Sequence, residues 1–230
     1  MAELKKLEEK IGIDFKNPNL LKQSMVHRSY LNEHHDFSLG HNERLEFLGD
    51  AVLEIVVTEH LFENYPDEPE GELTNWRASL VNAKMLSKVA NELKVEEHLF
   101  LSRGEAKDKD SKARQYILAD SIEALIGAIY LDQGIKKAEK FVVKFILSKL
   151  DNILENKLYY DPKSRFQEIA QEKYGITPHY KVLSETGPDH KKVFEVGLYL
   201  GAEFVTKAKG SSKQEAQVES AKKGLEKKKW

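Results

Sequence analysis

The 230-residue chain contains no cysteine. Without thiols it forms no disulfide bonds and offers no thiolate ligands, so any metal ion must be held by oxygen or imidazole donors. The absence of cysteine is also consistent with a protein of a reducing compartment, where disulfide bonds do not form.

Long apolar runs are missing as well. No stretch approaches the roughly 18 consecutive apolar residues that a membrane span requires. Residues 1–15 alternate charged residues with Leu and Ile at helical spacing and lack the continuous apolar segment of a secretory signal. We therefore expect a cytoplasmic protein that does not associate with membranes.

Neither sign of charge dominates, because the net charge is −2 at pH 7 and 32% of the residues are charged. The distribution along the chain is uneven. Residues 161–230 hold 14 of the 36 basic and 10 of the 38 acidic residues, a net of +4, which leaves a net of −6 for residues 1–160. An acidic first part joined to a basic second part is a weak indication of nucleic-acid binding.

The chain is long enough for two domains. In the first part, apolar residues recur at helical spacing over residues 45–56, 80–89 and 122–129, and no strand-like alternation is seen. Residues 65–71, with two prolines and a glycine, form a loop. The pattern predicts an all-α domain over residues 1–157.

The pattern changes at residues 158–160, which we interpret as a linker, because Pro162 disfavours helix at the residue before it. The order beyond it is α-β-β-β-α, and this predicts a small α+β domain over residues 161–230. Lysines 227–229 are expected to fray. The expected elements are a helix at about 164–174, strands at 177–185, 192–200 and 203–208, and a helix at about 212–226.

Carboxylates are interleaved with apolar residues in two of the helical segments. Asp120 and Glu123 lie three residues apart on an otherwise apolar helix. Spacings of three and four place another four acids on one face of the earlier helix. These four are Glu43, Glu46, Asp50 and Glu54.

Two interpretations of these acids are open. They can be a solvated face or one side of an ion-pair ladder, with Arg44 and Arg77 as ordinary partners. Alternatively, acids on largely buried helices require pairing or a metal ion. Carboxylates from two helices, without thiolates, suit Mg²⁺ or Mn²⁺, and such an ion can activate water to hydrolyse a phosphodiester.

Residues 42–53, NERLEFLGDAVL, resemble the signature of the ribonuclease III family without a gap. The resemblance extends over nearly the whole chain, and four further pieces follow in the family's order. These are HRSY at 27–30, EGELT at 70–74, RASLV at 77–81, and ILAD at 117–120 running on to YLD at 130–132.

The resemblance implies a Mg²⁺-dependent endonuclease, with Mn²⁺ as a substitute, that cuts both strands of double-stranded RNA. It implies staggered ends with 5′-phosphates and 3′-hydroxyls, and the processing of ribosomal-RNA precursors and other structured transcripts. The implied site residues are Glu46, Asp120 and Glu123 as metal ligands, Asp50 and Glu123 as catalytic carboxylates, and Glu43 and Glu70 as supporting or RNA-contacting acids.

The family's nuclease domain is a homodimer whose two sites share one valley, so the resemblance also implies a homodimer. We expect Phe47, Leu48 and Val52 in the core or at the dimer interface. Their helix carries more apolar surface than one small helical domain can cover, which is typical of a two-fold interface.

Three blocks of the second part resemble the double-stranded-RNA-binding domain in order and spacing: residues 161–168, 187–194 and 210–216. A-form RNA hides its base edges in a deep, narrow groove. Recognition must therefore use 2′-hydroxyls and phosphates, which carry little sequence information.

This second resemblance implies the RNA-binding residues. Gln167 and Glu168 are expected to contact 2′-hydroxyls, His190 to enter the next minor groove, and Lys213 to bind phosphate at a helix N-terminus. Gln214 departs from the pattern, because the family commonly has a second lysine there. The lysines expected to compensate are Lys209, Lys222 and Lys223.

Two other functions fit parts of the sequence. A catalytically inactive protein that sequesters double-stranded RNA would have no need of the costly acids at positions 46, 50, 120 and 123. A helical metal phosphohydrolase acting on small nucleotides would leave the C-terminal domain without a role. The nuclease is the function that uses both parts of the chain.

Overall fold

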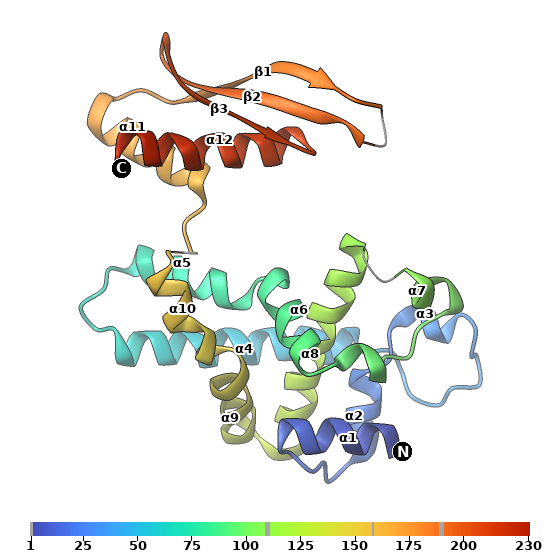
Figure 1. The fold of residues 1–230 in the computed structure, drawn as a ribbon. Helices are drawn as coiled ribbons and strands as arrows, with labels where there is room; N and C mark the ends of the chain where they lie inside the picture. Colours follow the sequence, from blue (N-terminus) through green and yellow to red (C-terminus); the bar gives the residue numbers. More distant parts are fainter. Residues whose placement is uncertain (1, 109–110, 158, 189–190) are drawn as a thin grey trace. The chain divides into compact units, whose positions relative to one another are not determined.

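The structure is a computed structural model that describes residues 2–108, 111–157, 159–188 and 191–230. The chain divides into two compact units, Met1–Tyr159 and Tyr160–Trp230 (Figure 1). Within the described residues, no helix combines the length and the apolar character that crossing a membrane would need.

The first unit is helical, as the sequence predicts. Its two longest helices, α4 and α8, have 22 residues each and pack against each other. The elements are α1 (Ala2–Ile11), α2 (Pro18–Ser24), α3 (Arg28–Leu31), α4 (Glu43–Asn64), α5 (Glu70–Val81), α6 (Ala83–Glu92), η1 (Val95–His98), α7 (Arg103–Lys107), α8 (Lys112–Gln133), α9 (Ile135–Phe145), η2 (Leu147–Lys149) and α10 (Leu150–Glu155).

Helix α8 is the central element of this unit. It is apolar around most of its circumference, so it can be stable only when other helices cover it. Leu125, Ile126 and Ile129 are fully buried in one continuous core with residues of α4 and α6. The helix begins at Ser111, whose Oγ accepts a hydrogen bond from the Arg114 backbone nitrogen at 3.1 Å. It ends at Gly134, which has a φ of 80°.

The second unit has the predicted order of a helix, three strands and a helix. The strands form one antiparallel sheet in the order β1-β2-β3, and α11 and α12 lie together on one side of it (Figure 1). Phe166, Leu198 and Val205 join the two layers in a small core. The elements are α11 (Pro162–Tyr174), β1 (His179–Thr186), β2 (Val193–Leu200), β3 (Glu203–Gly210) and α12 (Lys213–Lys228).

Several bounds of the second unit differ from the predictions by one or two residues, and β3 continues to Gly210 where the prediction ended at 208. Strand β1 begins two residues later than predicted, at His179, directly after Pro178, which has no N–H to donate to a neighbouring strand. The prediction that lysines 227–229 fray is wrong for the first two, because α12 extends through Lys228. Lys228 pairs with Glu203 at 2.8 Å, which ties the end of the helix to β3.

Candidate active site

The candidate site is built where α4 and α8 cross with their backbones in contact. A Cβ atom on Gly49 would lie 1.7 Å from the Glu123 carbonyl oxygen, and one on Gly127 would lie 2.2 Å from the Leu45 carbonyl oxygen. No side chain fits between the helices at these two points, so both positions require glycine. The crossing brings the turn that precedes Gly49 beside the turn that precedes Gly127.

Three carboxylates converge beside this crossing. Glu46 of α4 and Asp120 and Glu123 of α8 each offer one carboxylate oxygen, and these three atoms lie within 4.8 Å of one another. All three side chains are half-buried. An all-oxygen donor set on two rigid helices suits a hard divalent cation such as Mg²⁺.

The electrostatics of the cluster indicate a deficit of positive charge. Burial, followed by the neighbouring carboxylates Asp50 and Asp120, raises the pKa of Glu123 to about 8. The pKa of Glu46 is raised by burial and then by Asp120, and burial also raises the pKa of Asp120. A divalent cation would relieve the repulsion that these shifts report.

Asp50 and Glu43 lie at the edge of this cluster. Asp50 is exposed on α4, one turn beyond Glu46, and its charge raises the pKa of both Glu46 and Glu123. Glu43 acts in the same way on Glu46 and Asp120. It is also paired with Arg28 at 3.7 Å. Both acids are therefore within electrostatic reach of the three converging carboxylates without being among them.

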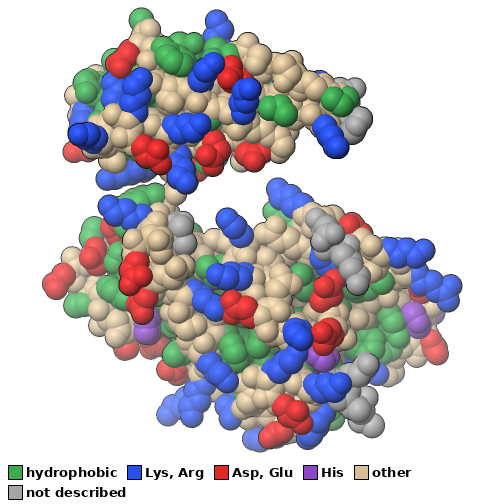
Figure 2. All heavy atoms as spheres, viewed as in Figure 1, with side chains coloured by type: hydrophobic (Ala, Val, Ile, Leu, Met, Phe, Trp, Pro, Cys, Tyr) green, Lys and Arg blue, Asp and Glu red, His purple; other side chains and the backbone are tan. Residues whose placement is uncertain are grey.

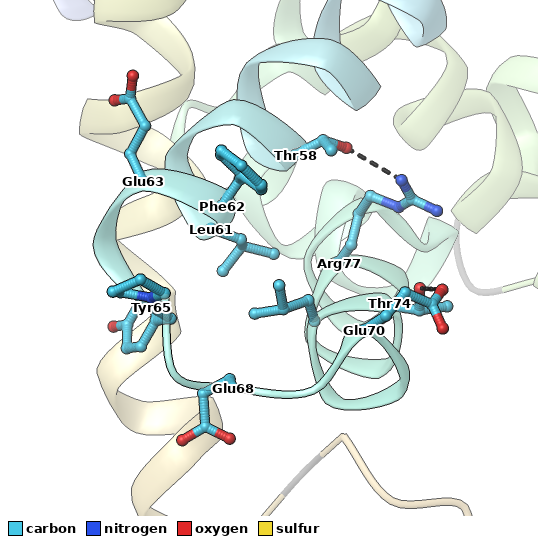
Figure 3. Close-up of a pocket in the computed structure, with 11 residues that line it drawn as sticks. Thr58, Leu61, Phe62, Glu63, Tyr65, Glu68, Glu70, Thr74 and Arg77 are labelled. Atoms are coloured by element: carbon cyan, nitrogen blue, oxygen red, sulfur yellow. Dashed lines mark hydrogen bonds between the residues drawn. The ribbon is translucent and has the colours of Figure 1, made fainter.

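Glu70 lies elsewhere, at the start of α5. It lines a pocket of about 650 Å³ between α4 and α5 and accepts a hydrogen bond from the Thr74 hydroxyl at 2.9 Å (Figure 3). Beside it, Arg77 pairs with Glu54 at 3.1 Å. The ion-pair interpretation thus describes Glu54 and, through Arg28, Glu43. Glu46 belongs instead to the cluster of acids.

Comparison with known proteins identifies both units. Residues 17–150 match the family described as Ribonuclease-III-like, and residues 162–228 match the double-stranded RNA binding motif. Ribonuclease 3 of Borreliella burgdorferi is 44% identical over 220 residues, which are 96% of this chain and 89% of that protein. The chain belongs to the ribonuclease III family. Ribonuclease 3 of Nitratiruptor is 42% identical over 98% of this chain and 96% of its own length.

Solved structures agree with this family assignment. The nuclease domain of ribonuclease III from Campylobacter jejuni superposes with a TM-score of 0.57 at 38% identity, over 65% of this chain and 97% of that one. The resemblance stated from the signature sequence is confirmed, and so is the class of enzyme. This ribonuclease III family member is an endoribonuclease that acts on double-stranded RNA.

The predicted RNA-binding side chains of the second unit are accessible wherever the structure describes them. Lys213 is the first residue of α12, where Ser212 caps the helix, so it stands at a helix N-terminus as predicted. His190 lies outside the described residues. On the face drawn in Figure 2, Lys and Arg side chains of this unit are interspersed with acidic ones. The exposed set comprises Gln167 and Glu168 on α11, Lys209 on β3, and Lys213, Lys222 and Lys223 on α12.

Sequence reasoning missed the surroundings of Lys213. Its Nζ lies 3.1 Å from a carboxylate oxygen of Glu185 and 5.5 Å from the centroid of the Phe194 ring. Glu185 sits near the end of β1, and a single acid in an alternating strand gives no sign of such a pairing. The lysine predicted to bind phosphate therefore already has an anionic neighbour.

The expected interface residues are only partly at the surface. Val52 is 5% exposed and belongs to the core, and Leu48 is half-buried against it. Phe47, by contrast, is 81% exposed. Sequence reasoning missed two further exposed apolar residues of α4, Ile55 and Phe62, at 57% and 72%.

Proposed function

We propose that this ribonuclease III family member is a Mg²⁺-dependent endonuclease, with Mn²⁺ as a substitute, that cuts both strands of double-stranded RNA. The products would be staggered ends with 5′-phosphates and 3′-hydroxyls. The observation that supports this most directly is the convergence of three carboxylate oxygens within 4.8 Å. A divalent cation bound there would supply the positive charge that acidifies a water molecule and stabilises the leaving oxygen.

Each acid has a proposed role. Glu46, Asp120 and Glu123 would hold the cation. Asp50 is exposed beside them and would orient the attacking water together with Glu123, since a carboxylate at hydrogen-bond reach can hold or accept its proton. Glu43 would hold Arg28 at the rim of the site, and Glu70 would contact RNA from its position outside the cluster.

The RNA-binding unit has the complementary role. Gln167 and Glu168 would contact 2′-hydroxyls, and Lys213 would contact phosphate, as would the other exposed lysines. His190 would enter the next minor groove, as the resemblance implies. The accessibility of the described members of this set supports the proposal.

We further propose a homodimer formed through α4. Phe47, Ala51, Ile55 and Phe62 are spaced by four, four and seven residues, so they lie on one face of the helix, and all four are exposed. We call this row the α4 stripe. Three large apolar side chains that are this exposed on one helix face are typical of interfaces. The similar nuclease domain from Campylobacter jejuni contains a region involved in dimer formation.

A two-fold axis would give the α4 stripe a partner. Phe47 and Phe62 are roughly 22 Å apart along the helix axis. In an antiparallel pairing of two α4 helices, Phe47 of one copy would meet the Phe62 end of the other. At that end lies the pocket of about 650 Å³, with Leu61, Phe62 and Tyr65 on one wall (Figure 3). The pocket is large enough to accept a phenylalanine ring, and Leu61, Phe62 and Leu73 would give it apolar contacts.

The domain limits and natural substrates are proposals of the same kind. We propose domains at residues 1–157 and 161–230 joined by residues 158–160. The natural substrates would be ribosomal-RNA precursors and other structured transcripts, because the proposed contacts to 2′-hydroxyls and phosphates recognise the shape of a duplex with little regard to its sequence.

One experiment tests the catalytic proposal. Long double-stranded RNA is incubated with the wild type, Glu123→Ala and the control Glu139→Ala, an exposed acid on α9. The wild type and the control should shorten the RNA to discrete products in Mg²⁺ but not in EDTA. Glu123→Ala should bind RNA normally and cut at least about a hundredfold more slowly. Wild-type turnover by Glu123→Ala would falsify the metal assignment.

Retention of RNA by the wild type without any cutting in Mg²⁺ would instead favour a sequestering protein. Hydrolysis of free nucleotides, with long RNA left intact, would favour a phosphohydrolase. The gel and a nucleotide assay on the same samples therefore separate the three functions.

A further inference from the structure

The sheet of the C-terminal unit has a face that the helices do not cover. In β2, Leu198 and Leu200 belong to the core that includes residues of α11 and α12, and Val196, two residues before Leu198, is fully buried. Tyr199 and Gly197 therefore belong to the opposite face. Hydrophobic side chains are visible on the sheet side of this unit (Figure 2).

An aromatic row crosses all three strands on this outer face. His179 of β1 pairs with Tyr199 of β2, which pairs with Phe204 of β3. The His179 and Tyr199 rings are stacked with centroids 5.3 Å apart and planes 12° apart. The Phe204 ring meets Tyr199 edge-on at 5.4 Å. Phe204 is 45% exposed and His179 is exposed, so the row is open to solvent.

Gly197 shapes the middle of this surface. A Cβ atom there would lie 3.0–3.3 Å from atoms of Tyr199, Leu183 and Phe204, so the absence of a side chain lets these three close over the strand. Leu183 is itself 39% exposed. We call His179, Leu183, Tyr199 and Phe204, with Gly197 beneath them, the outer sheet patch.

The next positions along the strands are lysines. Lys181 and Lys207 pair with Gly197 from either side, and Lys209 pairs with Glu195 one step further. All three lysines are exposed. Glu195 is the acid within this set, and Lys207 pairs with it at 3.2 Å. The border of the patch therefore carries a net positive charge, about 7 Å along the strand from the aromatic row.

We propose that the outer sheet patch binds unpaired nucleotides of RNA. Exposed aromatic rings stack on bases of any sequence, and lysines beside them neutralise the phosphates. The charged border argues for a polyanion over an apolar protein partner. Most of the duplex-binding residues proposed above lie on α11 and α12, on the other side of the sheet from the aromatic row, and Lys209 is the member of that set that also borders the patch. Such a site would bind the single-stranded segments that flank duplexes in structured transcripts.

The test uses the full-length protein in EDTA, so that no RNA is cut. Binding of a labelled ten-nucleotide RNA without self-complementarity is measured by fluorescence anisotropy, and binding of a short RNA duplex is measured in parallel. Phe204→Leu keeps the apolar bulk but removes the ring, and should weaken single-strand binding by about fivefold or more. Phe204→Tyr keeps an aromatic ring and should bind the single strand as the wild type does. Both variants should bind the duplex within about twofold of the wild-type affinity.

Two further variants guard against indirect effects. Tyr174→Leu makes the same kind of change at an exposed ring on α11 and should leave single-strand binding unchanged. Lys181→Ala, at an exposed site, should lower the salt dependence of single-strand binding by about one unit.

The proposal is overturned if Phe204→Leu binds the single strand as tightly as the wild type, or if the wild type binds only the duplex. It is equally overturned if Phe204→Leu changes the sedimentation of the protein but not its affinity for the oligonucleotide, because the patch would then join copies of the chain. If the wild type does not bind the RNA duplex, the result contradicts the duplex-binding role proposed above for the C-terminal unit, which is a separate proposal from the outer sheet patch.

Discussion

Glu123, a proposed metal ligand, lies in surroundings that make its charged form unfavourable and so lower the stability of the protein at neutral pH. Its pKa in the folded protein is about 8 against an ordinary value of 4.5, mainly because it is buried and then because Asp50 and Asp120 are near. The folded protein thus binds this proton more tightly than the unfolded chain does. Below pH 4.5 both states are protonated and the favourable contribution is complete. It is lost as the pH rises towards 8, because the unfolded chain releases the proton first.

We therefore expect the metal-free protein to become less stable between pH 5 and about 8, with Glu46 and Asp120 contributing in the same direction. Glu123→Gln should flatten much of this slope and raise the free energy of unfolding at pH 8 by about 1–2 kcal/mol, after allowance for partial exposure. Melting temperatures in EDTA across this pH range provide the measurement. Equal slopes for wild type and variant would contradict the assigned pKa.

The ion pair between Glu185 and Lys213 competes with the phosphate contact that is proposed for this lysine. The Glu185 carboxylate lies 3.1 Å from the Nζ of Lys213, where an RNA phosphate is proposed to bind. Glu185→Gln should free this lysine, tighten duplex binding about two- to tenfold and steepen its salt dependence by up to about one unit. Affinity across a salt series checks this, with Glu226→Gln at an exposed position of α12 as control. Weaker binding by Glu185→Gln would mean that Glu185 positions the lysine.

The crossing of α4 and α8 is the element that sets the geometry of the site. Gly49→Ala would place a methyl group 1.7 Å from the Glu123 carbonyl oxygen, so the helices must separate. We expect a loss of about 1–3 kcal/mol in unfolding free energy, and a fall in cleavage of about a hundredfold even where the variant is folded. Denaturant unfolding and single-turnover cleavage measure the two effects.

Gly71→Ala is the matched control, because a Cβ on Gly71 of α5 meets nothing within 4 Å. It should be neutral or slightly stabilising, since alanine favours helix over glycine by up to about 1 kcal/mol. If both variants behave alike, the backbone contact is not what positions the carboxylates.

The elements show how far sequence reasoning extends. Strand β2 was predicted at 192–200 and observed at Val193–Leu200, because alternation and a glycine turn are local signals. The contact between Gly49 and Gly127 could not be predicted, since it joins residues 78 positions apart and spacing alone does not show which helices touch. Nor could periodicity separate Val52 from Ile55, one in the core and one exposed, because α4 is apolar on two faces.

At the scale of the whole molecule, the α4 stripe predicts the assembly. Phe47 is 81% exposed in the single chain, so the charge that Phe47→Asp introduces should leave the monomer folded. The same charge would lie inside the proposed dimer interface, so the dimer should dissociate. Sedimentation at micromolar concentration should shift from dimer to monomer, and cutting of both strands should give way to single-strand nicks. The control Glu59→Asp, at an exposed position of the same helix, keeps the negative charge of that side chain. It should change neither the sedimentation of the protein nor its cutting of both strands. A wild-type monomer that still cuts both strands together would refute the proposed pairing.

The uneven charge of the chain assigns different tasks to its two parts. The first 160 residues carry a net charge of −6 and the remaining 70 a net of +4. An acidic surface repels RNA except where a cation bridges carboxylate and phosphate, so the basic part should supply most of the salt-sensitive affinity.

Deletion of residues 161–230 should consequently weaken duplex binding by at least about a hundredfold at physiological salt, because the released counterions are lost with the lysines. Cutting should survive at low salt and raised Mg²⁺, since Glu46, Asp120 and Glu123 all remain.

Lys213→Ala in the full chain should weaken binding to two unrelated RNA duplexes equally and lower the salt slope by about one unit. The measurement is affinity for both RNA duplexes and for the matching DNA duplexes over a salt series. A much larger effect on one RNA sequence would show that Lys213 contacts bases. Equal affinity of the wild type for DNA, which lacks 2′-hydroxyls, would contradict the 2′-hydroxyl contacts proposed for Gln167 and Glu168.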